Sequence, residues 1–165
     1  STQSRRYSLT PNHPFLHIAS GAFVGVGMAL HALLVARFLP NLNLPLPTLN
    51  AEKVVWLFGL FGSLIIPAEE LFFRGKLFSF LFDEKLVSLK KTILWISILN
   101  LIVYLPALIY LSKNPGALPF GVISFLYKFI LSATTVFIVY RWRNLYVGFA
   151  ANLAFSMLII QPFYL

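Results

Sequence analysis

The sequence predicts an all-α, polytopic bundle of transmembrane helices with about five spans in a single domain. Hydrophobic residues make up 59% of the 165 residues and charged residues only 11%, whereas soluble domains carry about 25% charged residues. Apolar stretches of about 20 residues, the length that a helix needs to cross a bilayer, recur along the chain. The basic residues behind the net charge of +8 lie between these stretches. That pattern is typical of membrane topology and argues against a nucleic-acid partner.

The apolar stretches define the expected spans in chain order. The first, 15–39, is too long for a signal peptide and lacks a cleavage pattern, so we expect a retained helix. The second, 54–82, is too long for an upright crossing. We expect it to tilt, to kink near Pro67 or to run past the bilayer surface. The remaining spans are 92–112, 120–140 and 145–164.

Lysine and arginine are distributed unevenly along the chain, and this bias sets the expected orientation. Most of them lie before the first span, around the end of the second span, or between the fourth and fifth spans, while the opposite side has only Arg37, Lys53 and Lys113. The positive-inside rule then places the N-terminus in the cytoplasm, or in the stroma of an organelle. We expect a bacterial inner membrane or a thylakoid or other organellar membrane. A basic polar segment, 1–14, precedes the transmembrane domain, 15–165.

Two adjacent carboxylates and an arginine interrupt the second span, in the stretch IPAEELFFRG at 66–75. Charged groups at bilayer depth cost at least about 2.5–3.5 kcal/mol each, so intramembrane acids indicate a function. Glu70 and Arg74 are four residues apart on a helix and are expected to pair. Glu69 points about 100° away and is expected to have no partner in its own helix. The alternative is that all three lie near the cytoplasmic surface, where water solvates them.

Two polar pairs on later spans repeat the four-residue spacing. Asn100 and Tyr104 lie on the third span, and Asn152 and Ser156 lie on the fifth. Each pair presents polar groups on one helix face, and such groups most often form hydrogen bonds between transmembrane helices. Together with the acids, they indicate one shared polar centre.

The same three stretches resemble the motifs of the CPBP family, the CAAX-protease and bacteriocin-processing intramembrane proteases. EELFFR at 69–74 resembles the EExxxR motif of that family. ISILNLIVYLPAL resembles the FxxxH helix, with Asn100 at the Phe position and Tyr104 at the His position. YVGFAANLAFSM resembles the HxxxN helix, with Asn152 and Ser156 at its two motif positions. The resemblance covers a core of about 54–164.

The resemblance implies that Glu69, the first motif glutamate, activates a water that two histidines help to bind or polarise. Both histidines are missing here, since Tyr104 is a weak acid and Asn152 does not titrate. Neither replaces imidazole as a general base near neutral pH or as a metal ligand. Each acid–base group contributes about 10²–10⁴ to a rate, so the chemistry should be lost. We therefore expect a pseudoprotease without a metal or a cofactor.

The leading functional hypothesis is a catalytically inactive CPBP-like membrane protein. It would act as an accessory subunit, an assembly factor or a scaffold of a membrane protein complex, with the lipid bilayer and other integral membrane proteins as partners. Asn100 and Ser156 are the candidate partner-binding residues at the centre, and family analogy adds a photosynthetic complex as one setting. Two alternatives stay open. One is an active intramembrane endopeptidase with an altered centre that uses Glu69 or Glu70, and the other is a component of a proton or ion pathway.

The first span carries two histidines, His17 and His31, about 21 Å apart along a helix. They cannot both reach the motif centre. A bis-histidine haem would need a histidine from another span, and no other span has one. Each is therefore a candidate single ligand of a chlorophyll-type pigment, and a bound pigment or lipid is the alternative to a chain without a cofactor. A hydrogen-bonded or interfacial histidine is the favoured interpretation.

Overall fold

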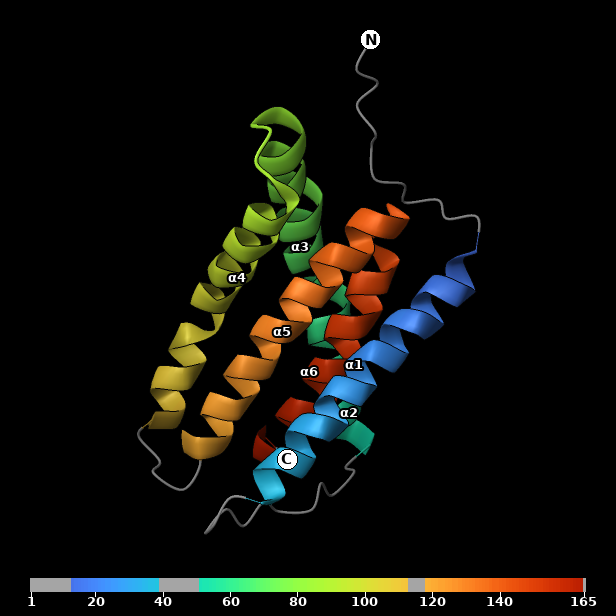
Figure 1. Cartoon of the computed structure of the whole chain (residues 1–165). Helices are drawn as coiled ribbons and strands as arrows, with labels where there is room; N and C mark the ends of the chain where they lie inside the picture. Colours follow the sequence, from blue (N-terminus) through green and yellow to red (C-terminus); the bar gives the residue numbers. More distant parts are fainter. Residues whose placement is uncertain (1–12, 39–50, 113–117, 165) are drawn as a thin grey trace.

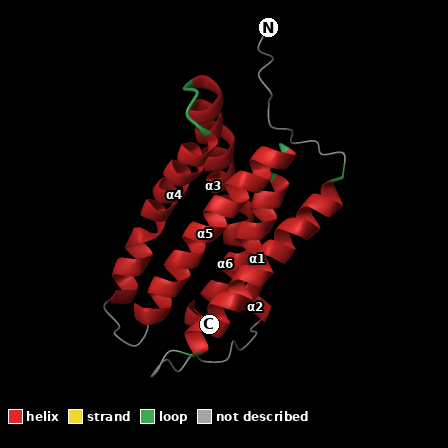
Figure 2. Cartoon of the chain, in the orientation of Figure 1, coloured by secondary structure: helices red, strands yellow, loops and turns green. Residues whose placement is uncertain are grey.

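The computed structural model describes residues 13–38, 51–112 and 118–164, which are helical apart from short connections and contain no strand (Figure 2). The first helix, α1, is Pro14–Arg37. A long helical run follows, made of α2 (Ala51–Leu60), η1 (Phe61–Ile65), α3 (Ile66–Glu69), η2 (Glu70–Leu77) and η3 (Ser79–Glu84). The last helices are α4 (Leu89–Ser112), α5 (Leu118–Trp142) and α6 (Tyr146–Tyr164). The prediction of an all-α bundle is confirmed, while most of the N-terminal segment and two predicted connections lie outside the described residues.

The helices run side by side in alternating directions (Figure 1). The start of α1, the hairpin between η3 and α4, and the connection between α5 and α6 all lie at one end of the bundle. The basic residues of these segments therefore gather at one end, as the charge distribution predicts: Lys85, Lys90, Arg141 and Arg143. Which side of the membrane this end faces stays a prediction.

Three of the described helices are long and apolar enough to cross a membrane: Pro14–Arg37, Leu89–Pro106 and Leu118–Trp142. A shorter apolar stretch, Tyr146–Ile159, belongs to α6. The chain is therefore a multi-pass membrane protein, and the kind of membrane stays a prediction.

The run from α2 to η3 extends past the neighbouring ends of α5 and α6 (Figure 1). Whether this long stretch tilts in the membrane or runs past the bilayer surface stays a prediction. Its segments η1, η2 and η3 are π-helical. In a π-helix each hydrogen bond spans five residues, and the wider turn often marks a functional site. We attribute η1 to Pro67, because a proline ring collides with the carbonyl group four residues earlier in a regular α-helix.

Helix α1 packs on α6 through small residues. The buried residues of α1 form one stripe: Gly21, Gly25, Ala29, Ala32 and Ala36. A β-carbon at Gly21 would overlap the carbonyl oxygen of Val147, and one at Gly25 would overlap that of Ala151. We call these four residues (Gly21, Gly25, Val147 and Ala151) the small-residue seam. Close backbone approach of this kind is a common way for helices to associate in membranes, because apolar burial alone gives no driving force there.

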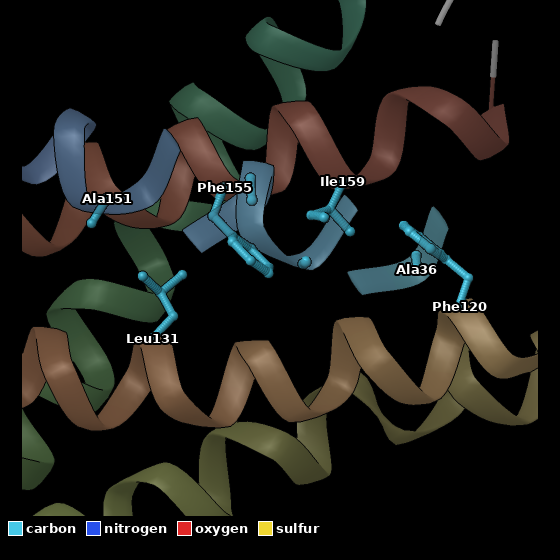
Figure 3. Packing of buried hydrophobic residues seen from close by; sticks show 8 residues of the cluster. Ala36, Phe120, Leu131, Ala151, Phe155 and Ile159 are labelled. Atoms are coloured by element: carbon cyan, nitrogen blue, oxygen red, sulfur yellow. The ribbon is translucent and has the colours of Figure 1, made fainter. Parts of the chain in front are cut away.

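Two of the three apolar clusters among the described residues flank the centre of the bundle. The larger joins α1, α5 and α6, and Figure 3 shows Leu131 of α5 and Phe155 of α6 within it. The smaller joins η2 and η3 to α4 and α5 around Phe73, Ile96 and Val136. On α5, helical periodicity places Leu131 and Val136 on either side of a narrow polar stripe. The two clusters thus flank a centre that is polar.

Candidate functional site

The polar centre consists of nine buried or half-buried side chains from four parts of the bundle. They are Glu69, Glu70 and Arg74 of α3 and η2, Asn100 and Tyr104 of α4, Lys128, Ser132 and Thr135 of α5, and Asn152 of α6. Asn100 lies about 17 Å along the axis from the start of α4, so the centre is deep in the bundle. Arg74 is fully buried and Glu69 is only 7% exposed. This burial disagrees with the alternative of solvated groups near the surface.

Arg74 binds both carboxylates of its own helical run. Its Nη1 lies 2.8 Å from Glu70 Oε1 and 3.5 Å from Glu69 Oε1. Its other nitrogens donate to α5, with Nε 2.9 Å from Thr135 Oγ1 and Nη2 3.3 Å from Ser132 Oγ. The expectation that Glu69 lacks a partner in its own helix is therefore wrong. The π-helical turns explain this, because they bring residues five apart, such as Glu69 and Arg74, to the same side.

Both oxygens of the Glu69 carboxylate are occupied. Oε1 accepts a hydrogen bond from Asn100 Nδ2 at 2.7 Å and lies 3.1 Å from Lys128 Nζ. Oε2 accepts a hydrogen bond from the Tyr104 hydroxyl at 2.5 Å. Donors from α4 and α5 thus surround this carboxylate on both sides.

Glu70 is less completely bonded. Its Oε1 accepts hydrogen bonds from Arg74 and from Asn152 Nδ2. Its Oε2 is buried without a hydrogen-bond partner among the described residues. This oxygen lies against Gly148 of α6, where a β-carbon would overlap it. Because Gly148 has no side chain, the Glu70 carboxylate has room to lie against α6.

The sequence analysis missed three residues of the polar centre, Lys128, Ser132 and Thr135, and of these Lys128 carries a charge. Its Nζ donates to Asn152 Oδ1 at 2.7 Å, pairs with Glu69, and lies 4.3 Å from the centroid of the Tyr104 ring. The signal was present, since it is a single lysine amid the apolar residues of the fourth span. Two hydroxyl residues, Ser132 and Thr135, follow it on the same helix face at four and seven positions.

The charges of the polar centre balance. The carboxylates of Glu69 and Glu70 face the guanidinium of Arg74 and the ammonium of Lys128. Buried charges are retained only when they are paired and hydrogen-bonded, so this balance allows the four charged groups to stay buried in the bundle. Among the described residues, no group of three or more His, Cys, Asp or Glu side chains could hold a metal ion.

The structure brings most of the predicted site residues together, because their side chains bind Glu69 or Glu70. Ser156 is buried one turn beyond Asn152. Among the described residues, it is not one of the donors to the two carboxylates. It therefore lies on the same helix face as the centre without binding its acids.

The two candidate pigment ligands lie outside the polar centre and have protein neighbours. The ring of His17 stacks on that of Trp142, with centroids 5.1 Å apart, and its Nδ1 is 2.5 Å from Asn144 Nδ2. The Nδ1 of His31 is hydrogen-bonded to the Tyr127 hydroxyl of α5. Both histidines thus join α1 to α5 or to the α5–α6 connection.

A comparison with protein families gives one match. The family described as type II CAAX prenyl endopeptidase Rce1-like matches residues 51–158, which is well over half of the chain. The matched region contains every residue of the polar centre, whereas α1 precedes it. No curated protein and no solved structure matches the chain.

Proposed function

We propose, since the chain belongs to the Rce1-like family of type II CAAX prenyl endopeptidases, that it is a catalytically inactive member that acts by binding other integral membrane proteins. In that role it would be an accessory subunit, an assembly factor or a scaffold of a membrane complex. The observation that carries this proposal is the occupation of both Glu69 oxygens by donors from the protein itself.

A general base must present a free lone pair to the proton that it removes, within hydrogen-bond reach of the reacting water. Glu69 Oε1 is engaged by Asn100 and Lys128, and Oε2 is engaged by Tyr104. The carboxylate is also buried. A water would have to displace one of these groups before Glu69 could activate it.

The two motif positions without histidine are engaged in the same way. The hydroxyl of Tyr104 donates to Glu69, so its proton points at the acid. The amide of Asn152 donates to Glu70 and accepts from Lys128, which uses both of its ends. These bonds join α3 and η2 to α4, α5 and α6. They support a structural role for the polar centre, in which it locks the core together.

A binding role fits the outer surface of the bundle. Large apolar side chains project outward from several helices, for example Phe23 of α1, Trp56 of α2 and Val103 of α4, each more than half exposed. Such faces pack on lipid or on the helices of a partner protein. The family's membrane-embedded core would then serve as the scaffold that presents them.

Purification in mild detergent of the tagged native protein and of its Glu69→Gln variant tests the proposal. Glu69→Gln removes one partner of a buried ion pair, so we expect a lower yield of the variant. We expect the folded fraction of both forms to run in the same larger, stoichiometric complex on a native gel, with the same integral membrane proteins identified by mass spectrometry. A protein that runs alone, and whose variant accumulates an uncut membrane protein, would contradict the proposal and indicate a protease.

One observation favours a second function, an active endopeptidase with an altered centre. Glu70 Oε2 has no hydrogen-bond partner among the described residues, so one buried carboxylate oxygen keeps free lone pairs. In this alternative Glu70 would be the base. Glu70→Gln would then abolish a cleavage that Glu69→Gln leaves in place.

A further inference from the structure

We infer that the side chain of Lys128 is a tethered occupant of a site for a small monovalent ammonium cation. The site is built by Glu69, Tyr104 and Asn152, which come from three different parts of the fold. Its centre is the position of Lys128 Nζ, 3.1 Å from Glu69 Oε1, 2.7 Å from Asn152 Oδ1 and 4.3 Å from the Tyr104 ring centroid.

Each of the three groups around this nitrogen attracts a cation. A carboxylate gives a charge-assisted hydrogen bond. An amide oxygen accepts a further N–H, and the face of a tyrosine ring attracts a nearby ammonium group. The orientation of the Asn152 amide follows from its second bond, because Nδ2 donates to Glu70 and Oδ1 is thereby left to face the lysine.

The charge balance requires a cation at this point. Without Lys128, the two carboxylates would face Arg74 alone and the buried centre would carry one uncompensated negative charge. Arg74 lies closer to Glu70, at 2.8 Å, than to Glu69, at 3.5 Å. Glu69 therefore depends on Lys128 for its near counter-ion, and removal of one partner of a buried pair is strongly destabilising.

The ligand chemistry fits an ammonium ion and not a divalent metal. The nitrogen meets one carboxylate, one amide oxygen and one aromatic face, and no described group of three acidic, histidine or cysteine side chains surrounds it. Divalent metals need more anionic or imidazole ligands than this. An ammonium group, which is an N–H donor with a full positive charge, uses all three groups at once.

The inference deepens the proposed function and rests on it in one respect, that Glu69 activates no water. The ammonium nitrogen lies between the Glu69 carboxylate and Asn152. It therefore takes the space that a reacting water between these two groups would need. Lys128 would then be the residue that keeps the centre closed.

Chemical rescue of a truncated lysine tests the inference. Lys128→Ala removes three methylene groups and the amine, which together correspond to n-propylammonium. We expect Lys128→Ala and the neutral, space-filling Lys128→Met each to lower the Tm in detergent by about 10 °C. Added n-propylammonium chloride should raise the Tm of Lys128→Ala but not that of the wild type or of Lys128→Met, whose side chains fill the site. The uncharged 1-propanol should have no such effect.

A double variant gives the answer even if Lys128→Ala does not fold. Lys128→Met combined with Glu69→Gln removes both charges of the pair, and we expect it to be more stable than Lys128→Met alone. Three results would each overturn the inference. Lys128→Met could be as stable as the wild type, or 1-propanol could raise the Tm of Lys128→Ala as much as the amine does. The double variant could also be no more stable than Lys128→Met alone. These readouts use neither cleavage nor complex formation, so they fail independently of the proposed function.

Discussion

The polar centre and the small-residue seam hold the bundle together by opposite means. In the polar centre, large charged side chains such as Arg74 and Lys128 reach across helices to fixed partners. In the seam, Gly21 and Gly25 present no side chain, and the backbones of α1 and α6 meet directly. The first region is therefore sensitive to the removal of a group, and the second is sensitive to the addition of one.

The two regions also differ in their relation to the family. The polar centre lies wholly within residues 51–158, the part that matches the family, whereas the seam joins that part to α1, which precedes it. The centre thus locks the family core, and the seam attaches a further helix to it. Variants in the two regions should separate these roles.

The largest effect is expected from Arg74→Met. The change removes the group that pairs with both acids and bonds to Thr135 and Ser132, so two buried carboxylates would share Lys128 alone. Breaking a buried ion pair costs about 3–5 kcal/mol, and we expect a loss of stability at least that large. Thermal unfolding in detergent measures it, with the exposed Lys76→Met as the matched control. Equal stability of the two variants would show that the polar centre does not stabilise the bundle.

A smaller effect is expected from Gly25→Ala in the seam. The new β-carbon would overlap the carbonyl oxygen of Ala151, so α1 and α6 would have to move apart. Such overpacking costs about 1–3 kcal/mol. Gly27→Ala is the matched control, because nothing lies within 4 Å of a β-carbon there, and alanine is the better helix former. The same unfolding measurement should rank Gly25→Ala below the wild type and Gly27→Ala level with or above it; the reverse order would contradict the close packing of α1 on α6.

The smallest effect is expected from Ser132→Ala. Ser132 accepts one hydrogen bond from Arg74 at 3.3 Å, while three other acceptors of that guanidinium remain. Loss of a single hydrogen bond costs about 0.5–1.5 kcal/mol. A loss as large as that of Arg74→Met would mean that the pairing with the acids is not the dominant contribution of the arginine.

Much of the fold could be predicted from the sequence because hydropathy and length determine membrane spans. The first predicted span, 15–39, corresponds to α1 at Pro14–Arg37, and the last, 145–164, to α6 at Tyr146–Tyr164. Four-residue spacing also predicted the contact between Glu70 and Arg74. These features depend on local sequence alone.

The rest depended on information that local patterns do not hold. The contact of Glu69 with Arg74 needs π-helical turns, which the expectation of a regular helix excluded. Lys128 was missed because basic residues were interpreted as topology signals, although a lysine in the middle of an apolar span should itself indicate a buried partner. The contact of α1 with α6 was not predicted, because it joins residues that lie far apart in the sequence.

The central claim is that the polar centre is closed by its own side chains and performs no hydrolysis. Cleavage of a farnesylated peptide that ends in a CAAX sequence tests it most directly, with the purified protein and its Glu69→Gln variant in liposomes and an active CAAX endopeptidase as the positive control. We predict that neither the wild type nor Glu69→Gln releases more of the C-terminal tripeptide than liposomes without protein do. Release by the wild type that Glu69→Gln or Glu70→Gln abolishes would contradict the claim and show that the substituted acid still activates water.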